Sequence, residues 1–338
     1  MKQNDGTVFL QLNTEVSFAR AGYGPKWCFM IDVVYCFNKN YFQHFAASVT
    51  SLVLNFRGQP SQLRIHLLSD TTSELLQAFI EDFQRVFSVD VRLNVITAEQ
   101  FDVINRIPEP LRNLAHFTVA AYFRLLLPEV MAQEISKVLY LDSDTIILDD
   151  ISELFSADLQ GNALAAVLDP ETKVLSKAHK IDYYFNSGVM VMDLALWRRD
   201  ELARKCLEHL QDPDSLIWQA DQCAINVILK GRIKEVPPRW NSFTHDPLFK
   251  PGARKDLEPN TAIIHYITKH KPWHAWYSNA RRDFYWQYLN VSLWKPKELT
   301  QPTTVNENVW MARKLVADGK SQDAVQVYEK VIKHLLSK

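Results

Sequence analysis

The first part of the chain contains two kinds of apolar pattern. Continuous apolar runs rich in β-branched residues, at 28–37 (CFMIDVVYCF) and 63–68 (LRIHLL), are typical of buried strands. Segments 41–56 and 72–87 have helical character, and 89–96 alternates like a strand. This β-α-β-α-β order predicts an α/β fold whose central sheet is mostly parallel and flanked by helices.

The remaining chain is less regular. Its apolar spacing predicts the following elements: a helix at 116–127 closed by Pro128, strands at 138–141, 163–168, 185–192 and 261–267, and helices at 194–210, 221–229 and 273–289. We expect residues 1–26 to be a loose leader and residues 27–295 to be the main domain. Residues 296–338 predict a helical hairpin that turns at Gly319, and because one such pair cannot bury itself, it should dock on the main domain or serve as a partner surface.

Composition excludes several classes of protein. The net charge of −1 gives no general attraction for nucleic acid, so we expect no nucleic-acid partner. Only 9 of 338 residues are glycine, and neither G-x-G-x-x-G nor a P-loop occurs, so a glycine-rich loop does not hold any nucleotide phosphate. The four cysteines form no C-x-x-C and the first residues lack a signal-peptide pattern, which predicts a cytoplasmic protein with reduced thiols.

The most informative segment is 137–148, KVLYLDSDTIIL, in which an apolar strand runs into Asp142, Ser143 and Asp144. In extended backbone, residues i and i+2 point to the same side, so the two carboxylates should converge. Alone and buried they would repel each other, and a divalent cation removes that conflict. A solvated turn with two capping residues is the alternative, but the apolar residues on both sides favour the metal site.

A second candidate segment is 265–276, HYITKHKPWHAW, which follows an apolar strand. His265 can be a third metal ligand, and Lys269 and Lys271 can contact phosphate oxygens. Trp273 and Trp276 can form the pocket wall and stack on a sugar.

Two alternatives stay open for the same segment. Its three histidines could bind zinc as H-x4-H-x3-H, from His265, His270 and His274. The segment could also be a plain amphipathic helix with basic and aromatic faces.

Three further groups are weaker candidates. Asn186, Ser187 and Gly188 precede a buried strand, where a glycine allows a ligand or another backbone to come close, although an ordinary loop-to-strand turn explains them better when they are taken alone. Asp221, beside Gln222, could simply cap a helix. His116 could be a core histidine, and Arg124 could be a surface ion-pair partner.

Taken in order, these segments resemble glycosyltransferase family 8, whose members use nucleotide sugars and have the GT-A fold. The resemblance spans roughly residues 30–295 and is nearest to the bacterial lipopolysaccharide core glucosyl- and galactosyltransferases. The matching segments are VVYCFNKNY (33–41), AAYFRL (120–125), KVLYLDSDTII (137–147), YFNSGVMVMDLALW (184–197), DQ (221–222) and HYITKHKPWHAW (265–276).

The resemblance implies a role for each matching residue. Asp142, Asp144 and His265 would bind a divalent cation, Mn²⁺ or Mg²⁺. Gln222 and Asp221 would steady the transferred sugar. The residues that would contact the donor or the acceptor are Asn38, Asn40, His116, Arg124, Asp142, Ser143, Asp144, Asn186, Ser187 and Lys271.

The activity it implies is retaining transfer of a hexose, glucose or galactose, from a UDP-sugar to a glycan, with the lipopolysaccharide core oligosaccharide or another lipid-linked glycan as acceptor. Eight basic and five acidic residues give 295–338 a net charge of +3, which is compatible with peripheral contact at the inner face of the plasma membrane. A basic aromatic rim would suit an anionic acceptor. Its members would be Lys269, Lys271, Trp273, Trp276, Tyr277, Arg281, Arg282, Tyr285 and Trp286.

Two positions depart from the family pattern. Asn38 stands where the family usually has aspartate at the uracil, and Thr268 stands where it has a glycine near the diphosphate. Threonine is β-branched and disfavours positive φ. Three alternatives therefore stay open: a protein- or self-glucosylating relative, a nucleotide-sugar- or glycan-binding module with weak turnover, and an interaction protein that uses the hairpin.

Overall fold

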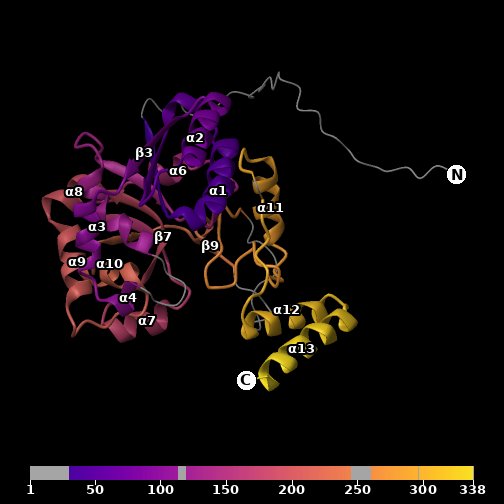
Figure 1. Ribbon diagram of the computed structural model, residues 1–338. Coiled ribbons are helices and arrows are strands. Elements are labelled where there is room, and N and C mark those ends of the chain that lie inside the picture. The colour runs from indigo at the N-terminus through magenta and orange to yellow at the C-terminus, as the bar shows by residue number, and fades with distance from the viewer. Residues whose placement is uncertain (1–29, 113–118, 245–259, 296, 338) are drawn as a thin grey trace.

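The computed structural model describes residues 30–112, 119–244, 260–295 and 297–337. Its centre is a seven-stranded sheet of order β3-β2-β1-β4-β7-β6-β8 (Figure 1). Only β7 runs antiparallel to its neighbours, so the predicted mostly parallel α/β sheet is confirmed. The strands are β1 (Ile31–Phe37), β2 (Leu63–Ser69), β3 (Asp90–Val95), β4 (Lys137–Leu141), β6 (Leu164–Leu168), β7 (Phe185–Asp193) and β8 (Ile233–Glu235).

Helices cover both faces of this sheet, because successive residues of a strand point to opposite sides. On β1, Val33 and Tyr35 join one apolar core and Val34 and Cys36 join the other. The first core includes α1 (Phe42–Asn55), α2 (Glu74–Phe87) and α6 (Ser152–Phe155). The second includes α3 (Ala98–Asn105), η3 (Val119–Leu126), α5 (Leu127–Val130), α8 (Leu194–Arg199), α9 (Leu202–Gln211) and α10 (Ala220–Ile228). The remaining short helices are η1 (Lys39–Tyr41), η2 (Pro60–Gln62), α4 (Glu109–Arg112), α7 (Thr172–His179) and η4 (Pro238–Trp240).

A second, three-stranded sheet lies beside the first and was not expected from the sequence. It has the order β5-β10-β9 and consists of β5 (Thr145–Ile147), β9 (Ser242–Phe243) and β10 (Ile263–His265). β10 pairs antiparallel with β5, and its register sets His265 opposite Thr145. Because β5 starts directly after the acidic residues at 142 and 144, this pairing brings a distant histidine to them.

Two helix predictions around residue 120 and residue 200 need correction. Residues 119–126 of this segment form the 3₁₀ helix η3. Pro128 does not close a helix but lies in the first turn of α5, where the backbone N–H that proline lacks is not needed for a helical hydrogen bond. The predicted helix at 194–210 is two helices, since Glu201 has a left-handed φ of 52° between α8 and α9.

The predicted aromatic helix at 273–289 is wrong over its first half. Only α11 (Arg282–Val291) is helical. The backbone groups of Trp273 and Ala275 are instead paired with Thr300, whose N–H donates to Trp273 O and whose carbonyl accepts from Ala275 N–H, both at 2.9 Å. An isolated β-bridge between His274 and Thr300 thus overrides the local helical spacing.

The C-terminal hairpin is present as predicted and consists of α12 (Val305–Ala317) and α13 (Ser321–Leu336) (yellow in Figure 1). Thr304 and Glu307 form a capping box at its start, and Gly319 has the positive φ, 77°, that the turn requires. The boundary at 295–296 stays a prediction, and the predicted leader over 1–26 lies outside the described residues.

Two further observations concern the cysteines and the membrane. Cys36, Cys206 and Cys223 are buried free thiols, and Cys28 lies outside the described residues. Among the helices that the structure describes, none has the length and apolar character to cross a membrane.

Candidate active site

A cavity of about 810 Å³ opens where the carboxyl ends of β1 and β4 meet the start of β7. Because β7 is antiparallel, its first residues lie at the same edge as the last residues of β4, and Asp142 N–H donates to Gly188 O at 2.8 Å. The cavity volume is in the range of small-molecule sites. It is lined by polar and charged side chains that include Arg124, Asp142, Asp144 and His265.

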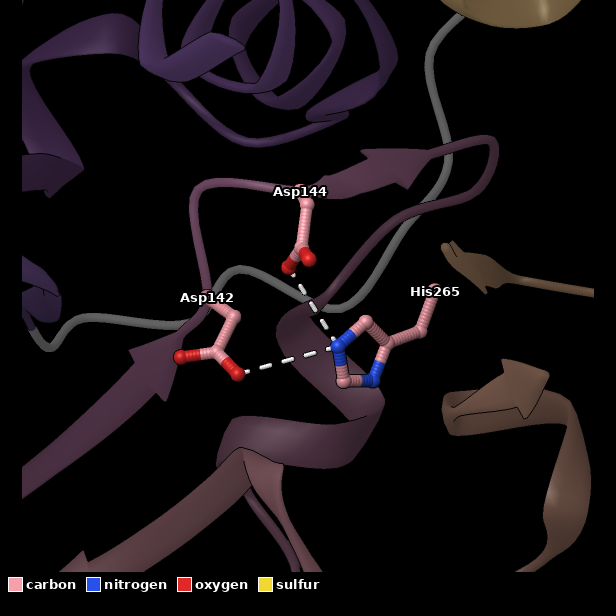
Figure 2. A group of neighbouring side chains, drawn as sticks. All are labelled: Asp142, Asp144 and His265. Atoms are coloured by element: carbon pink, nitrogen blue, oxygen red, sulfur yellow. Dashed lines mark ion pairs between the residues drawn. The ribbon is translucent and has the colours of Figure 1, made fainter. Parts of the chain in front are cut away.

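Asp142 and Asp144 reach the same point from opposite sides of a turn. The sequence predicted extended backbone here, but Thr145 N–H donates to Asp142 O at 3.2 Å, so residues 142–145 form a tight turn between β4 and β5. Figure 2 shows both carboxylates pointing toward the Nε2 atom of His265. Nε2 lies 3.6 Å from Asp142 Oδ2 and 3.3 Å from Asp144 Oδ1.

The second oxygen of each carboxylate is held by a buried cation. Asp142 Oδ1 accepts from Arg124 Nη2 at 2.9 Å and from the hydroxyl of Tyr140 at 2.6 Å, and Asp144 Oδ2 accepts from Lys271 Nζ at 2.6 Å. Burial raises the pKa of Asp144, but Lys271 and His265 outweigh burial and hold this pKa well below its ordinary value. Asp144 is therefore a carboxylate at neutral pH, with one oxygen left facing His265.

The orientation of the His265 ring follows from a chain of hydrogen bonds. The backbone N–H of Gly188 donates to Asn186 Oδ1 at 3.0 Å, which fixes that atom as an acceptor. Asn241 therefore donates to it with Nδ2, at 2.9 Å, and its own Oδ1 accepts from His265 Nδ1 at 2.9 Å. His265 therefore points Nδ1 at Asn241, and Nε2 is the ring nitrogen that faces the two acids.

Gly188 provides the space that this arrangement needs. A Cβ at this position would lie 2.2 Å from Cε1 of His265 and 2.7 Å from Asp142 Oδ2. The sequence suggested that a ligand or a backbone approaches this glycine, whereas the group that approaches is the imidazole. Any larger residue would displace the histidine from the acids.

These three side chains suit a divalent cation. The donor atoms of Asp142, Asp144 and His265 all lie within 4.8 Å of one another, and two carboxylates with one imidazole are a ligand set suited to a divalent cation such as Mn²⁺. Within the described ranges, no other group of three acids, histidines or cysteines converges in this way. The zinc alternative is therefore not formed: His270 packs against Trp310, with ring centroids 4.6 Å apart, and His274 stacks on Trp276 at 4.4 Å.

Arg124 connects the acids to the residues at 186–187 and 221–222. Its Nη1 donates to Ser187 O at 2.7 Å, and its Nε lies 3.1 Å from Asp221 Oδ2. The side chain of Gln222 accepts from Ser187 N–H at 2.9 Å and donates to Asp169 Oδ2 at 3.0 Å. These residues form one buried polar network at the cavity wall.

The capping interpretation of Asp221 is wrong. Gln219 is the residue before α10, and Asp221 lies in the first turn with 2% of its surface exposed. Burial raises its pKa to about 6, against the lowering effect of Arg124. The surface interpretation of Arg124 is wrong for the same reason, because its guanidinium is buried among carboxylates.

The other predicted site residues lie in different surroundings. Ser143 and Lys271 line the cavity. Asn38 and Asn40 do not line it, although the neighbouring Phe37 does; Asn38 Oδ1 accepts from Asn40 N–H at 3.0 Å at the start of η1. His116 lies outside the described residues.

The predicted aromatic rim is mostly core. Trp273 and Trp276 are buried and do not line the cavity; Trp273 stacks on His44 with ring centroids 3.4 Å apart. Tyr277, Tyr285 and Arg281 are buried as well. Of the predicted members, the cavity wall includes only the two lysines at 269 and 271. The rings of Trp273, Tyr277 and Tyr285 are instead buried in the apolar cluster between the second sheet and α11, and this burial keeps them away from the cavity.

Sequence reasoning missed several residues of the site. Asp169, Trp218 and Gln219 line the cavity, and Asn241 orients His265. None of them belongs to a spaced motif, so only their position in the fold reveals them. Thr268, which also lines the cavity, has a φ of 74°, the left-handed conformation that threonine disfavours.

Known glycosyltransferases and one stress protein resemble this chain in sequence or structure. A general stress protein A of Bacillus subtilis is 28% identical over 78% of this chain and 95% of its own length. A lipopolysaccharide 1,3-galactosyltransferase of Salmonella typhimurium is 24% identical over 94% of each chain. The crystal structure of the galactosyltransferase LgtC, in complex with donor and acceptor sugar analogues, superposes with a TM-score of 0.66 at 25% identity and covers 79% of this chain and 98% of that one.

The family model of Glycosyl transferase family 8 matches residues 32–277, which include the acids, the histidine and the buried network around Arg124. The match extends over well more than half of the 338 residues, and the fold is that of the solved glycosyltransferases. The chain therefore belongs to glycosyl transferase family 8 and is a glycosyltransferase with the GT-A fold.

Proposed function

We propose that this protein transfers a hexose, glucose or galactose, from a UDP-sugar to the lipopolysaccharide core oligosaccharide, with retention of anomeric configuration. The observation that carries the proposal is the convergence of Asp142, Asp144 and His265 at one point of the cavity wall, with Lys271 beside them. A cationic lysine next to a cation site is suited to a diphosphate. The galactosyltransferase relatives support the sugar class and the acceptor class.

In this proposal the protein is metal-dependent, and Asp142, Asp144 and His265 hold the cation. A bound divalent cation supplies Lewis-acid stabilisation of the charge that develops on the leaving diphosphate. Lys271 adds a fixed positive charge, because its ammonium is buried and tied to Asp144 Oδ2 and Tyr266 O, each at 2.6 Å. A preorganised charge of this kind needs no rearrangement as the bond to the sugar breaks.

The contacts of Gln222 and Asp221 bear on which retaining mechanism the site would use. A double displacement needs a carboxylate or amide oxygen that is free to attack the sugar. The Oε1 atom of Gln222 already accepts from Ser187 N–H, and the carboxylate of Asp221 is buried beside Arg124. Front-face attack by the acceptor hydroxyl is the alternative that these contacts favour, with both residues steadying the sugar and the leaving phosphate oxygen taking the proton.

The other site predictions are retained as part of the proposal. Asn38 and Asn40 would contact uridine and ribose near Phe37, and His116 would contact the acceptor. Peripheral contact with the inner face of a membrane also stays a prediction, from the +3 charge of 295–338.

The test is a panel of nucleotide sugars followed by a transfer assay. With Mn²⁺, UDP-glucose or UDP-galactose should raise the melting temperature, and EDTA should remove that effect. Mass spectrometry should then show that one hexose is added to purified core oligosaccharide, and NMR of the product should show the anomeric configuration of the donor. Asp144→Asn should lose transfer without loss of fold, whereas Asp82→Asn, at an exposed acid of α2, should retain it.

Two results would contradict the proposal: absence of metal-dependent stabilisation by every UDP-sugar, or full activity of Asp144→Asn. Hexose added to the protein itself, with no transfer to the oligosaccharide, would favour the self-glucosylating alternative.

A further inference from the structure

The cavity wall at 268–271 has an unfavourable backbone conformation. Thr268 lies at a φ of 74°, and its Oγ1 accepts from His270 N–H at 3.3 Å. A β-branched residue stays in the left-handed region only where the surrounding contacts hold it there. The same four residues carry Lys271, so whatever holds them also sets the charge beside Asp144.

Part of the restraint comes from inside the site. Lys271 Nζ donates to Asp144 Oδ2 and to Tyr266 O, which fixes the far end of the segment. These two bonds do not restrain the side chains of Lys269 and His270, which lie between the strained residue and Lys271.

The other part comes from the C-terminal hairpin. The indole of Trp310, on α12, packs against the ring of His270 in a T-shaped arrangement, with centroids 4.6 Å apart and ring planes at 77°. The ammonium of Lys269 lies 4.8 Å above the same indole, within the range of a cation–π contact. Trp310 also lies 6.2 Å from the ring of Trp276, which is buried. One aromatic side chain thus touches the two residues between Thr268 and Lys271.

We propose that Trp310 is a positioning residue for the donor site, whose indole holds residues 268–271 in the strained conformation that presents Lys271 to the diphosphate. Trp310 is not part of the cavity wall, so it acts through Lys269 and His270. The consequence for donor binding rests on the function proposed above; the effect on the segment itself does not. In this proposal the C-terminal hairpin supports the conformation of the donor site through Trp310.

The test compares Trp310→Leu with Trp310→Phe, because leucine keeps an apolar side chain and phenylalanine also keeps the aromatic contacts. Trp310→Leu should raise the KM for the UDP-sugar about tenfold, with a smaller change in kcat, and Trp310→Phe should stay within about twofold of the wild type. Ile332→Ala, at an exposed position of α13, is the control and should change neither value. Circular dichroism should show the hairpin folded in all variants.

A second readout does not need activity. In the protein without nucleotide, amide hydrogen exchange at 266–273 should be faster in Trp310→Leu than in Ile332→Ala. Adding Thr268→Asn should reverse part of the KM increase, because asparagine tolerates the left-handed region and needs less external restraint.

Equal exchange in Trp310→Leu and the control would overturn the proposal, as would a KM increase that Thr268→Asn leaves unchanged. If the wild-type protein uses no UDP-sugar, the proposed function fails, and the exchange experiment still decides the role of Trp310.

Discussion

Asn241 accepts a hydrogen bond from Nδ1 of His265 at 2.9 Å and thereby determines which ring nitrogen faces Asp142 and Asp144. Asn241 has no exposed surface and is itself oriented by Asn186, so the imidazole cannot rotate without breaking a buried hydrogen bond. Partners of this kind around metal ligands contribute to affinity although they never touch the metal.

Asn241→Ala should therefore weaken Mn²⁺ binding by about 10- to 100-fold. The buried Nδ1–H of His265 would lose its acceptor, and the ring would be free to present the wrong tautomer. Isothermal titration with Mn²⁺ measures the effect. Asn55→Ala removes an asparagine that bonds Ser51 O, Ile147 O and Tyr288, and it should change stability without changing the Mn²⁺ affinity. Equal Mn²⁺ affinities of Asn241→Ala and the wild type would show that the hydrogen bond does not orient the ligand.

Gly188→Ala should abolish Mn²⁺ binding and lower activity by at least about 100-fold, because the new Cβ would overlap Cε1 of His265. Gly161→Ala is the contrasting variant: nothing lies within 4 Å of its Cβ, but its φ of 77° disfavours alanine. It should cost about 1 kcal/mol of stability and leave the Mn²⁺ affinity unchanged. A Gly188→Ala enzyme that binds Mn²⁺ normally would contradict the steric account.

Lys271→Met should weaken binding of a UDP-sugar by at least about tenfold and leave binding of uridine unchanged, because the lysine would contact only the phosphates. Lys269→Met should have a smaller effect, since its ammonium lies over Trp310 instead of being tied to Asp144. Titration of both ligands against each variant provides the comparison. Equal losses for uridine and the UDP-sugar would assign Lys271 a structural role.

The raised pKa of Asp221 predicts that the stability of the protein depends on pH. Its pKa is about 6 in the folded protein against an ordinary value of 3.8, so between these values the folded state binds the proton more tightly than the unfolded chain. Its contribution to the free energy of unfolding therefore falls as pH rises from about 4 to 6, by about 3 kcal/mol at most. The side chain of Asn in Asp221→Asn has no proton to lose, so the stability of this variant relative to the wild type should increase as pH rises over this range.

Urea unfolding of the wild type and Asp221→Asn at pH 4.5 and pH 7.5 tests this. The difference in stability between the two proteins should move in favour of the variant at the higher pH. A difference that is the same at both pH values would mean that Asp221 titrates near its ordinary value.

Much of the fold could be predicted from the sequence, because the apolar spacing within each segment indicates whether that segment is a helix or a strand. The apolar run at 28–37 and the alternation at 89–96 report burial at each position, and a sheet with helices on both faces follows from their order. The acidic pair at 142 and 144 was identified for the same reason, since an acid inside an apolar run stands out locally.

The sequence by itself determined the order of the elements, the acidic pair and the family resemblance, because these are recorded in local spacing. Only the tertiary structure decided that His265 joins the acids, since antiparallel pairing of β10 with β5 brings together residues far apart in the chain. Backbone pairing with Thr300 likewise kept Trp273 out of a helix. The contact of Trp310 with His270 depends on how the hairpin docks, which no local periodicity encodes.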